Sequence, residues 1–201
     1  IGGMGLTGII LSAKLKLKKI PSIEVLSNIQ TTNCIEETLE LSKSIDNCDF
    51  FQCWVDALSA KKTLGKSVIM KAKFSKVPSR DNEYDIEQSL MRRTKIFNLI
   101  PSNIFWRASK FLFYPPFISK INYLYWKKAD IFSSNNWNKL LFTKYFFFHN
   151  NIPDFYSVYR PPGFVEIQAL IPTSVDPKMY RILIKKAQEN GLIPVLSGLK
   201  K

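Results

Sequence analysis

The sequence opens with Ile1-Gly-Gly-Met-Gly-Leu-Thr-Gly-Ile-Ile10 and continues as Leu11-Ser-Ala-Lys-Leu-Lys-Leu-Lys18. Gly3, Gly5 and Gly8 match the spacing G-x-G-x-x-G, which binds a dinucleotide pyrophosphate when a strand precedes the glycines and a helix follows them. Here apolar and polar residues alternate strictly after the glycines, and this alternation predicts a half-buried strand over 11–18. Because a strand follows the glycines, the context excludes the nicotinamide dinucleotide fold.

The four glycines in the first eight residues still need an explanation, because glycine loses more conformational freedom on folding than other residues. An ordinary tight turn before the strand is one explanation. The other is a backbone that passes close to a flat or bulky ligand. Spacing alone leaves both explanations open.

Length and composition limit the class of protein. A chain of 201 residues that is 46% hydrophobic can bury the core of one domain, or of one domain and part of another. No apolar run approaches the roughly 18 residues of a membrane-spanning helix. Cys34, Cys48 and Cys53 are odd in number and lack C-x-x-C spacing, which argues against a disulfide framework and a zinc site. His149 is the only histidine, so we expect no histidine-based metal or nucleophile site.

The net charge of +13 favours an acidic partner or surface. Much of the excess lies in Phe105–Lys144, where aromatic residues interleave with lysines and an arginine, and Asp130 is the only acidic residue. This mixture is typical of base stacking along a single strand, of a membrane-surface patch, or of a half-buried layer whose lysines extend outward. No nucleic-acid motif is present, so we expect no nucleic-acid partner.

Periodicity and turn signals predict alternating strands and helices. Strands are predicted at 11–18, 23–31, 50–55, 65–74, 140–149, 164–171 and 192–199, with a loop at 76–88, helical or irregular structure at 89–130 and a helical turn at 153–159. Asn33 as N-cap with Glu36 at the third helical position predicts a helix to about residue 44. The arrangement predicts an α+β fold, a largely antiparallel sheet with helices on one face.

A second helix is predicted at 177–190, with clear signals at both ends. Asp176 provides the N-cap, Pro177 suits the first helical position, and Gly191 provides the stop. The predicted buried stripe of this helix consists of Met179, Ile182, Leu183 and Ala187.

Two predicted strands carry side chains suited to binding. Alternation in Phe164–Ile171 places Glu166 and Gln168 on the face opposite the apolar residues, which we expect beneath the helix that begins at Pro177. Their face is either an ordinary solvated sheet face or one wall of a site. Alternation in the strand at 50–55 likewise places Gln52 and Trp54 together.

Three segments resemble FAD-linked oxidases of the vanillyl-alcohol oxidase family. The glycine run with its strand resembles the end of the flavin-binding domain of that family. Phe51-Gln-Cys-Trp-Val-Asp-Ala-Leu-Ser59 resembles the family form A-W-x-D-A-x-S, and Gly163–Pro172 resembles G-F-x-x-Y-Q-x-x-I-P. Within the family, the chain is most similar to oxidases of polyprenyl-phosphoryl pentoses.

The resemblance implies that the chain contains parts of two domains and that some residues of the family's site lie outside it. Residues 1–20 would be the incomplete edge of the FAD-binding domain, and residues 21–201 a substrate domain truncated at its C-terminal end. The pyrophosphate-binding loop would precede Ile1, and a base-like lysine would follow Lys201. No catalytic residue is therefore expected within the chain, which alone would be inactive.

The resemblance also implies site residues. FAD would contact Gly5, Gly8, Ile9 and Lys200, and the substrate would contact Trp54, Phe147, Glu166, Gln168 and Lys200. The family has a glutamine at the position of Glu166 and often a tyrosine at that of Phe147, and a slip of one residue would exchange Lys200 with Lys201. These departures bear on the identity of the substrate.

The implied activity is that of an FAD-dependent oxidoreductase that oxidises a secondary hydroxyl of a sugar, with a polyprenyl-phosphoryl pentose as substrate. A sugar-lactone oxidase of the same group is one alternative, and a non-enzymatic basic module for anionic lipid or nucleic acid is another. The expected partners are a lipid-linked sugar phosphate or another sugar, a reductase and a peripheral membrane contact. The expected location is the cytoplasm or the membrane surface.

Overall fold

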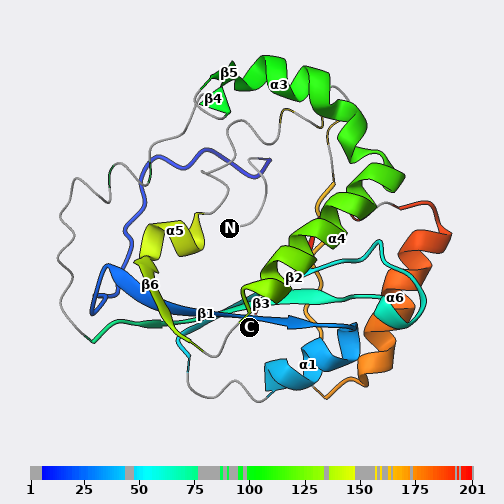
Figure 1. Ribbon diagram of the computed structural model, residues 1–201. Coiled ribbons are helices and arrows are strands. Elements are labelled where there is room, and N and C mark those ends of the chain that lie inside the picture. Colours follow the sequence, from blue (N-terminus) through cyan, green and yellow to red (C-terminus); the bar gives the residue numbers. More distant parts are fainter. Residues whose placement is uncertain are drawn as a thin grey trace.

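The centre of the molecule is a five-stranded antiparallel sheet with the strand order β6-β1-β3-β2-β7 (Figure 1). The computed structural model describes residues 6–43, 48–76, 87, 90, 95–96, 99–133, 136–147, 157, 159, 163, 165–172, 174–192, 194 and 196–200. The strands of this sheet are β1 (Glu24–Thr32), β2 (Phe50–Val55), β3 (Ser67–Phe74), β6 (Asn138–Leu141) and β7 (Ser197–Lys200).

Helices lie on both faces of the sheet. Helices α1 (Ile35–Lys43) and α6 (Pro177–Glu189) cover the face that carries Phe51, Cys53 and Val55, which we call the α1/α6 face. Helices α4 (Pro115–Ile131) and α5 (Phe142–Phe146) cover the opposite face, which carries Gln52 and Trp54 and which we call the α4/α5 face (Figure 1). The remaining short elements are η1 (Lys61–Thr63), β4 (Lys95–Ile96), β5 (Ile100–Pro101), α3 (Ser102–Ser109) and η2 (Lys110–Phe113).

The predicted α+β class with an antiparallel sheet is confirmed, but the expectation that the helices lie on one face is wrong. Residues 89–130 supplied no clear periodic stripe, and α4 from that region packs across β1 and β3. Because successive residues of a strand point to opposite faces, the strands could bury side chains on both sides. Val25 and Ala72 are buried on the α4/α5 face, and Ile69 on the α1/α6 face.

The main apolar core lies beneath α1 and α6. Ile35 and Leu39 of α1 pack on Phe51, Cys53, Val55 and Ile69, and Tyr180 and Ile184 of α6 join them. Gly65 connects η1 to β3 directly under Ile35. Its φ is +75°, and a Cβ at this position would lie 2.6 Å from the Cβ of Ile35, so a glycine is required for the helix to pack this closely.

The predicted helix ends are close to the observed ones. The side chain of Asp176 accepts a hydrogen bond from the Lys178 N–H at 2.8 Å, and Gly191 follows α6 with φ +72°. At α1 the capping register is one residue later than predicted. Glu37, rather than Glu36, accepts the hydrogen bond of the Asn33 N–H at 2.7 Å.

Helix α6 is rotated relative to the predicted buried stripe. Tyr180 and Ile184 face the core, whereas Met179, Ile182 and Leu183 are about half exposed. Polar contacts explain the rotation. Arg181 binds Glu36 of α1, and Gln188 Nε2 donates to the Ala57 carbonyl at 2.7 Å, so both must point inward.

Two predicted strands are absent. Residues 11–18 and 165–172 have no regular secondary structure, and most of their apolar side chains are exposed, as at Leu11 (94%) and Val165 (87%). Alternation creates a potential apolar face, but a strand also needs a neighbour for its backbone hydrogen bonds. Among the described residues, no strand pairs with either segment, and α6 packs on α1 and the sheet instead.

Two further strands are shorter than predicted. The strand predicted at 140–149 ends at Leu141, and α5 follows because Tyr145 and Phe146 turn back to pack on Phe50. Of the described residues in the strand predicted at 192–199, those from Ser197 onward belong to β7. The predicted loop at 76–88 and turn at 153–159 lie mostly outside the described residues.

Candidate functional site

The candidate site lies on the α4/α5 face where β2 meets β7. In the ladder between these strands Trp54 pairs with Gly198 and Gln52 pairs with Lys200. Residues paired across an antiparallel ladder project to the same face. The register therefore places Lys200, which is exposed, on the same face as Gln52 and Trp54.

The Trp54 indole contacts an aromatic ring of α4 on one side and has a glycine as its neighbour on β7. Its ring meets that of Tyr125 of α4 edge to face, with the centroids 4.9 Å apart. Its partner across the ladder is Gly198, which has no side chain, and a Cβ there would lie 3.0 Å from the Cys53 carbonyl oxygen. The absence of a side chain at Gly198 leaves the edge of the indole beside β7 uncovered by that neighbour.

Helix α5 closes the other end of this face. Gln52 Nε2 donates to the Tyr145 carbonyl at 3.1 Å, which fixes the end of α5 beside β2. Phe147 directly follows that helix and is 46% exposed. Of the predicted site residues, Trp54 and Lys200 therefore lie on one face of the sheet, and Phe147 follows the helix whose end lies beside Gln52. Lys201 lies outside the described residues.

Glu166 and Gln168 lie in the irregular segment 165–172. Gln168 Nε2 donates to Glu166 Oε1 at 2.6 Å, so the two side chains are adjacent, as alternation predicted. Both are exposed, and neither has a hydrogen bond to Trp54 or Lys200 in the described part of the chain. Whether they share a cavity with Trp54 stays a prediction.

Gly8 and Ile9 lie in the irregular segment that begins the described chain, and Gly5 is outside it. Gly8 has φ +150°, and a Cβ there would meet no atom within 4 Å. Ile9 is exposed. Packing within the described structure therefore does not explain why a glycine stands at position 8.

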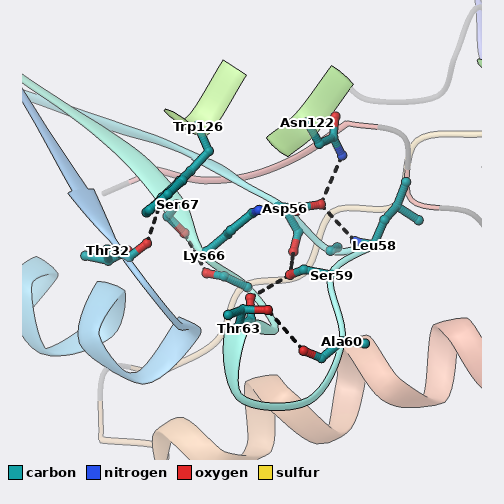
Figure 2. A network of polar contacts seen from close by, with 12 residues as sticks. Thr32, Asp56, Leu58, Ser59, Ala60, Thr63, Lys66, Ser67, Asn122 and Trp126 are labelled. Carbon is teal, nitrogen blue, oxygen red and sulfur yellow. Dashed lines mark hydrogen bonds and ion pairs between the residues drawn. The ribbon is translucent and has the colours of Figure 1, made fainter. Parts of the chain in front are cut away.

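A buried polar network links α4 to the segment between β2 and β3 (Figure 2). Asp56, only 1% exposed, directly follows β2. Its Oδ1 accepts hydrogen bonds from Asn122 Nδ2 of α4 at 3.0 Å and from the Leu58 N–H at 3.2 Å. Its Oδ2 lies 3.6 Å from Nζ of Lys66, which directly precedes β3.

Aromatic rings of α4 enclose the lysine of this network. The Lys66 ammonium lies 4.7 Å from the ring centroid of Tyr123 and 5.3 Å from that of Trp126. Trp126 Nε1 in turn donates to the Thr32 carbonyl at 3.0 Å (Figure 2). The network fixes α4 against β1 and the β2–β3 connection, and thereby holds Tyr125 against Trp54.

The titratable groups near the site are poor nucleophiles. Burial raises the pKa of the Cys53 thiol to about 12, so this cysteine is a neutral core residue. Burial also raises the pKa of the Tyr145 phenol, which donates a hydrogen bond to the Met70 carbonyl. Among the described residues no three metal-ligating side chains converge, and no described helix is long and apolar enough to cross a membrane.

Comparison with known proteins shows what the chain is similar to. No family model matches the chain. The chain is 23% identical over 205 residues to a protein named decaprenylphosphoryl-beta-D-ribose oxidase from Mycolicibacterium smegmatis. The similarity covers the whole chain and 42% of that protein, so the chain spans less than half the length of its relative. This relative supports the resemblance seen in the sequence.

Sequence reasoning assigned no role to Asp56, Lys66 or Asn122. The sequence offered one indication for Asp56. It is the acidic residue of the segment that resembles A-W-x-D-A-x-S, and it directly follows an apolar strand. Lys66 lies opposite Asp56 just beyond the β2–β3 ladder, where the Asp56 N–H donates to the Lys66 carbonyl at 2.9 Å. Asn122 follows Asp56 by 66 positions, and only the packing of α4 brings it to this pair.

Proposed function

We propose that this chain is part of an FAD-dependent oxidoreductase that oxidises a secondary hydroxyl of a sugar, and that the substrate is a polyprenyl-phosphoryl pentose. The observation that carries the proposal is the similarity of the whole chain to a ribose oxidase. The register of β7 on β2 supports it, because an indole and an ammonium then share one sheet face.

The residues of this face fit a flavin and a phosphorylated sugar. An indole with one open edge, Trp54, can form a wall beside a planar ring. The exposed ammonium of Lys200 can pair with a phosphate. Gly8 leaves its backbone accessible, which suits a close approach to a cofactor.

The reaction removes two hydrogens from one carbinol group. The hydroxyl proton leaves to a base, and the hydrogen on the same carbon leaves as hydride with its bonding electrons, which gives a ketone. FAD, when bound, supplies the hydride acceptor. We assign the base to no described residue, because Cys53 and Tyr145 are held protonated by burial.

In this proposal the chain binds and orients the substrate. Lys200 would hold the phosphate, and Trp54 would exclude water from one side of the sugar. Gln168 would donate to or accept from a sugar hydroxyl, with Glu166 fixing its amide orientation through their mutual hydrogen bond. Phe147 would add an apolar wall at the end of α5.

The test uses the full-length protein that contains this chain, purified and examined for flavin absorbance. Anaerobic flavin reduction is then measured with a polyprenyl-phosphoryl ribose and, separately, with a sugar lactone. Reduction by the lipid-linked sugar supports the proposal. Reduction by the lactone alone would show that the substrate is a sugar lactone and not a lipid-linked sugar. A purified protein without flavin would overturn the proposal.

Lys200→Met sharpens this test. Loss of a charge-assisted contact with phosphate weakens binding by about 1.5–3 kcal/mol, so we expect KM for the lipid-linked sugar to rise roughly 10- to 100-fold. Lys185→Met is the matched control, because Lys185 is an exposed lysine of α6 on the α1/α6 face. Equal KM values for the two variants would remove Lys200 from the site.

A further inference from the structure

Helix α4 has two contrasting faces. Its inner face carries the buried Ile118 and Asn122 and the indole of Trp126, which bonds to β1. Its outer face carries large apolar side chains at the opposite helical positions. These are Phe117, Ile121, Leu124 and Ile131, of which Leu124 is 64% and Ile131 68% exposed. The polar network already fixes the inner face, so the outer face is the one available to a partner.

Cationic side chains surround this outer apolar face. Lys120, Lys127 and Lys128 lie on α4 between the apolar positions, and all three are exposed. Residues 102–132 contain five basic residues and one acidic residue, a net charge of +4. The acidic residue, Asp130, accepts a hydrogen bond from Thr31 at 2.9 Å and contacts Lys127 at 3.2 Å. The surface is therefore both apolar and strongly positive.

Exposed aromatic residues continue this surface beyond α4. Phe111 of η2 and Tyr114 before α4 are 52% and 65% exposed, and Phe132 directly after α4 is 69% exposed. Large aromatic side chains next to lysines are typical of helices that lie at the boundary between lipid headgroups and acyl chains. The stems of the lysines add apolar surface while the ammonium groups reach the headgroups.

We propose that the outer face of α4, with Phe111, Tyr114 and Phe132 at its ends, docks on the surface of an anionic lipid bilayer. Charge complementarity with acidic headgroups selects this partner, since a net charge of +4 gathers on a single 31-residue stretch. The inference goes beyond the proposed function, because it concerns binding to a surface and requires no flavin chemistry. No described helix could span the bilayer, and the contact is a peripheral one.

The outer face of α6 provides an internal comparison. It also exposes apolar residues, Met179, Ile182 and Leu183, next to the lysines 178, 185 and 186. Each helix has one lysine paired with a carboxylate three residues later, but none of the three large exposed residues of α6 is aromatic. Lysines of α6 therefore provide variants with the same change of net charge at a different surface.

The experiment measures co-sedimentation of the full-length protein with vesicles. One set is pure phosphatidylcholine and the other contains about one-third phosphatidylserine. We expect binding to the anionic vesicles only, and binding that weakens as salt is raised. Lys120→Gln/Lys128→Gln should weaken it about 30-fold, at about 1 kcal/mol per lysine. The control Lys178→Gln/Lys185→Gln should leave it within about twofold.

The apolar part is tested by Leu124→Ser/Ile131→Ser, which leaves the net charge unchanged. We expect this variant to bind roughly tenfold more weakly, with the salt dependence of the unaltered protein. All six positions are exposed, and circular dichroism checks that the fold is kept. Equal losses for the two lysine pairs, no binding to anionic vesicles at low salt, or tighter binding to single-stranded nucleic acid than to vesicles would each overturn the inference.

Discussion

Two ion pairs, one on each side of the sheet, differ in length and in burial, and we expect the longer but more buried pair to contribute more to stability. On the α1/α6 face Arg181 binds Glu36 through two hydrogen bonds of 2.5 and 2.6 Å, with side chains 23% and 30% exposed. Near the α4/α5 face Lys66 lies 3.6 Å from Asp56, with side chains 10% and 1% exposed. Burial, rather than distance, decides what each pair contributes.

The physical reason lies in what remains when one partner is removed. A half-exposed charge that loses its partner is solvated by water, so surface pairs contribute from nothing to about 1 kcal/mol. A buried charge that loses its partner has no water to replace it. Breaking the Asp56–Lys66 pair should therefore cost more than breaking the Arg181–Glu36 pair, although its charged atoms are farther apart.

The largest expected effect is that of Asp56→Leu. Among the described residues it leaves the buried Lys66 ammonium with the Tyr123 and Trp126 rings as partners, and we expect a loss of about 3–5 kcal/mol in the free energy of unfolding, measured by urea denaturation. The double variant Asp56→Leu/Lys66→Met removes both charges and should recover most of that loss. A loss below about 1 kcal/mol for the single variant would show that the two pairs are equivalent.

Asn122→Leu should have a smaller effect. Asp56 Oδ1 then loses the Asn122 donor but keeps the Leu58 N–H, so we expect a loss of about 1–3 kcal/mol. Asn138→Leu, at an exposed asparagine of β6, is the matched control and should change stability by less than about 0.5 kcal/mol. If both variants behaved alike, the network would not anchor α4.

Glu36→Gln should have a still smaller effect, of at most about 1 kcal/mol, because water reaches both partners and screens the pair. Arg181 also donates to the Lys61 carbonyl at 2.7 Å and would keep that contact. Urea denaturation near neutral pH provides the measurement. A loss as large as that of Asp56→Leu would contradict the role given to burial.

The smallest expected effect is a change in acid stability. The hydrogen bond from Arg181 lowers the pKa of Glu36 from 4.5 to about 2. Because the folded-state pKa is lowered, the contribution is complete above about pH 4.5 and is lost as the pH falls toward 2. The difference in urea midpoint between the unaltered protein and Glu36→Gln should therefore shrink between about pH 5 and about pH 3. A difference that stays constant would show that Arg181 does not favour the ionised form.

Local signals predicted some elements, such as β2 and the ends of α6, whereas the contacts between elements were not predictable. Strand β2 has the predicted bounds, and Asp176 and Gly191 delimit α6, because alternation and capping depend on neighbours within a few residues. The rotation of α6 was missed because Arg181 turns inward to meet Glu36, a residue 145 positions away. Residues 11–18 have the pattern of a strand but no described partner strand.

The same division applies to the candidate site. Alternation alone placed Gln52 and Trp54 on one face, as the structure confirms. The place of Lys200 on that face follows from the register of β7 on β2, which no short pattern contains. Tyr125, which meets Trp54, comes from a helix whose docking depends on the buried network.

The pairing of β7 with β2 has a consequence for the order in which the sheet assembles. The β2–β3 ladder joins residues about 12 positions apart at its nearest pair, whereas the β2–β7 ladder joins residues about 140 positions apart. Closing the longer loop costs about 2 kcal/mol more in chain entropy, and β7 contributes only four residues in return. We therefore expect β1, β2 and β3 to form first, and β7 to be the first strand to detach. Lys200 lies on that detachable edge, so a ligand held by Lys200 would slow amide hydrogen exchange along β7.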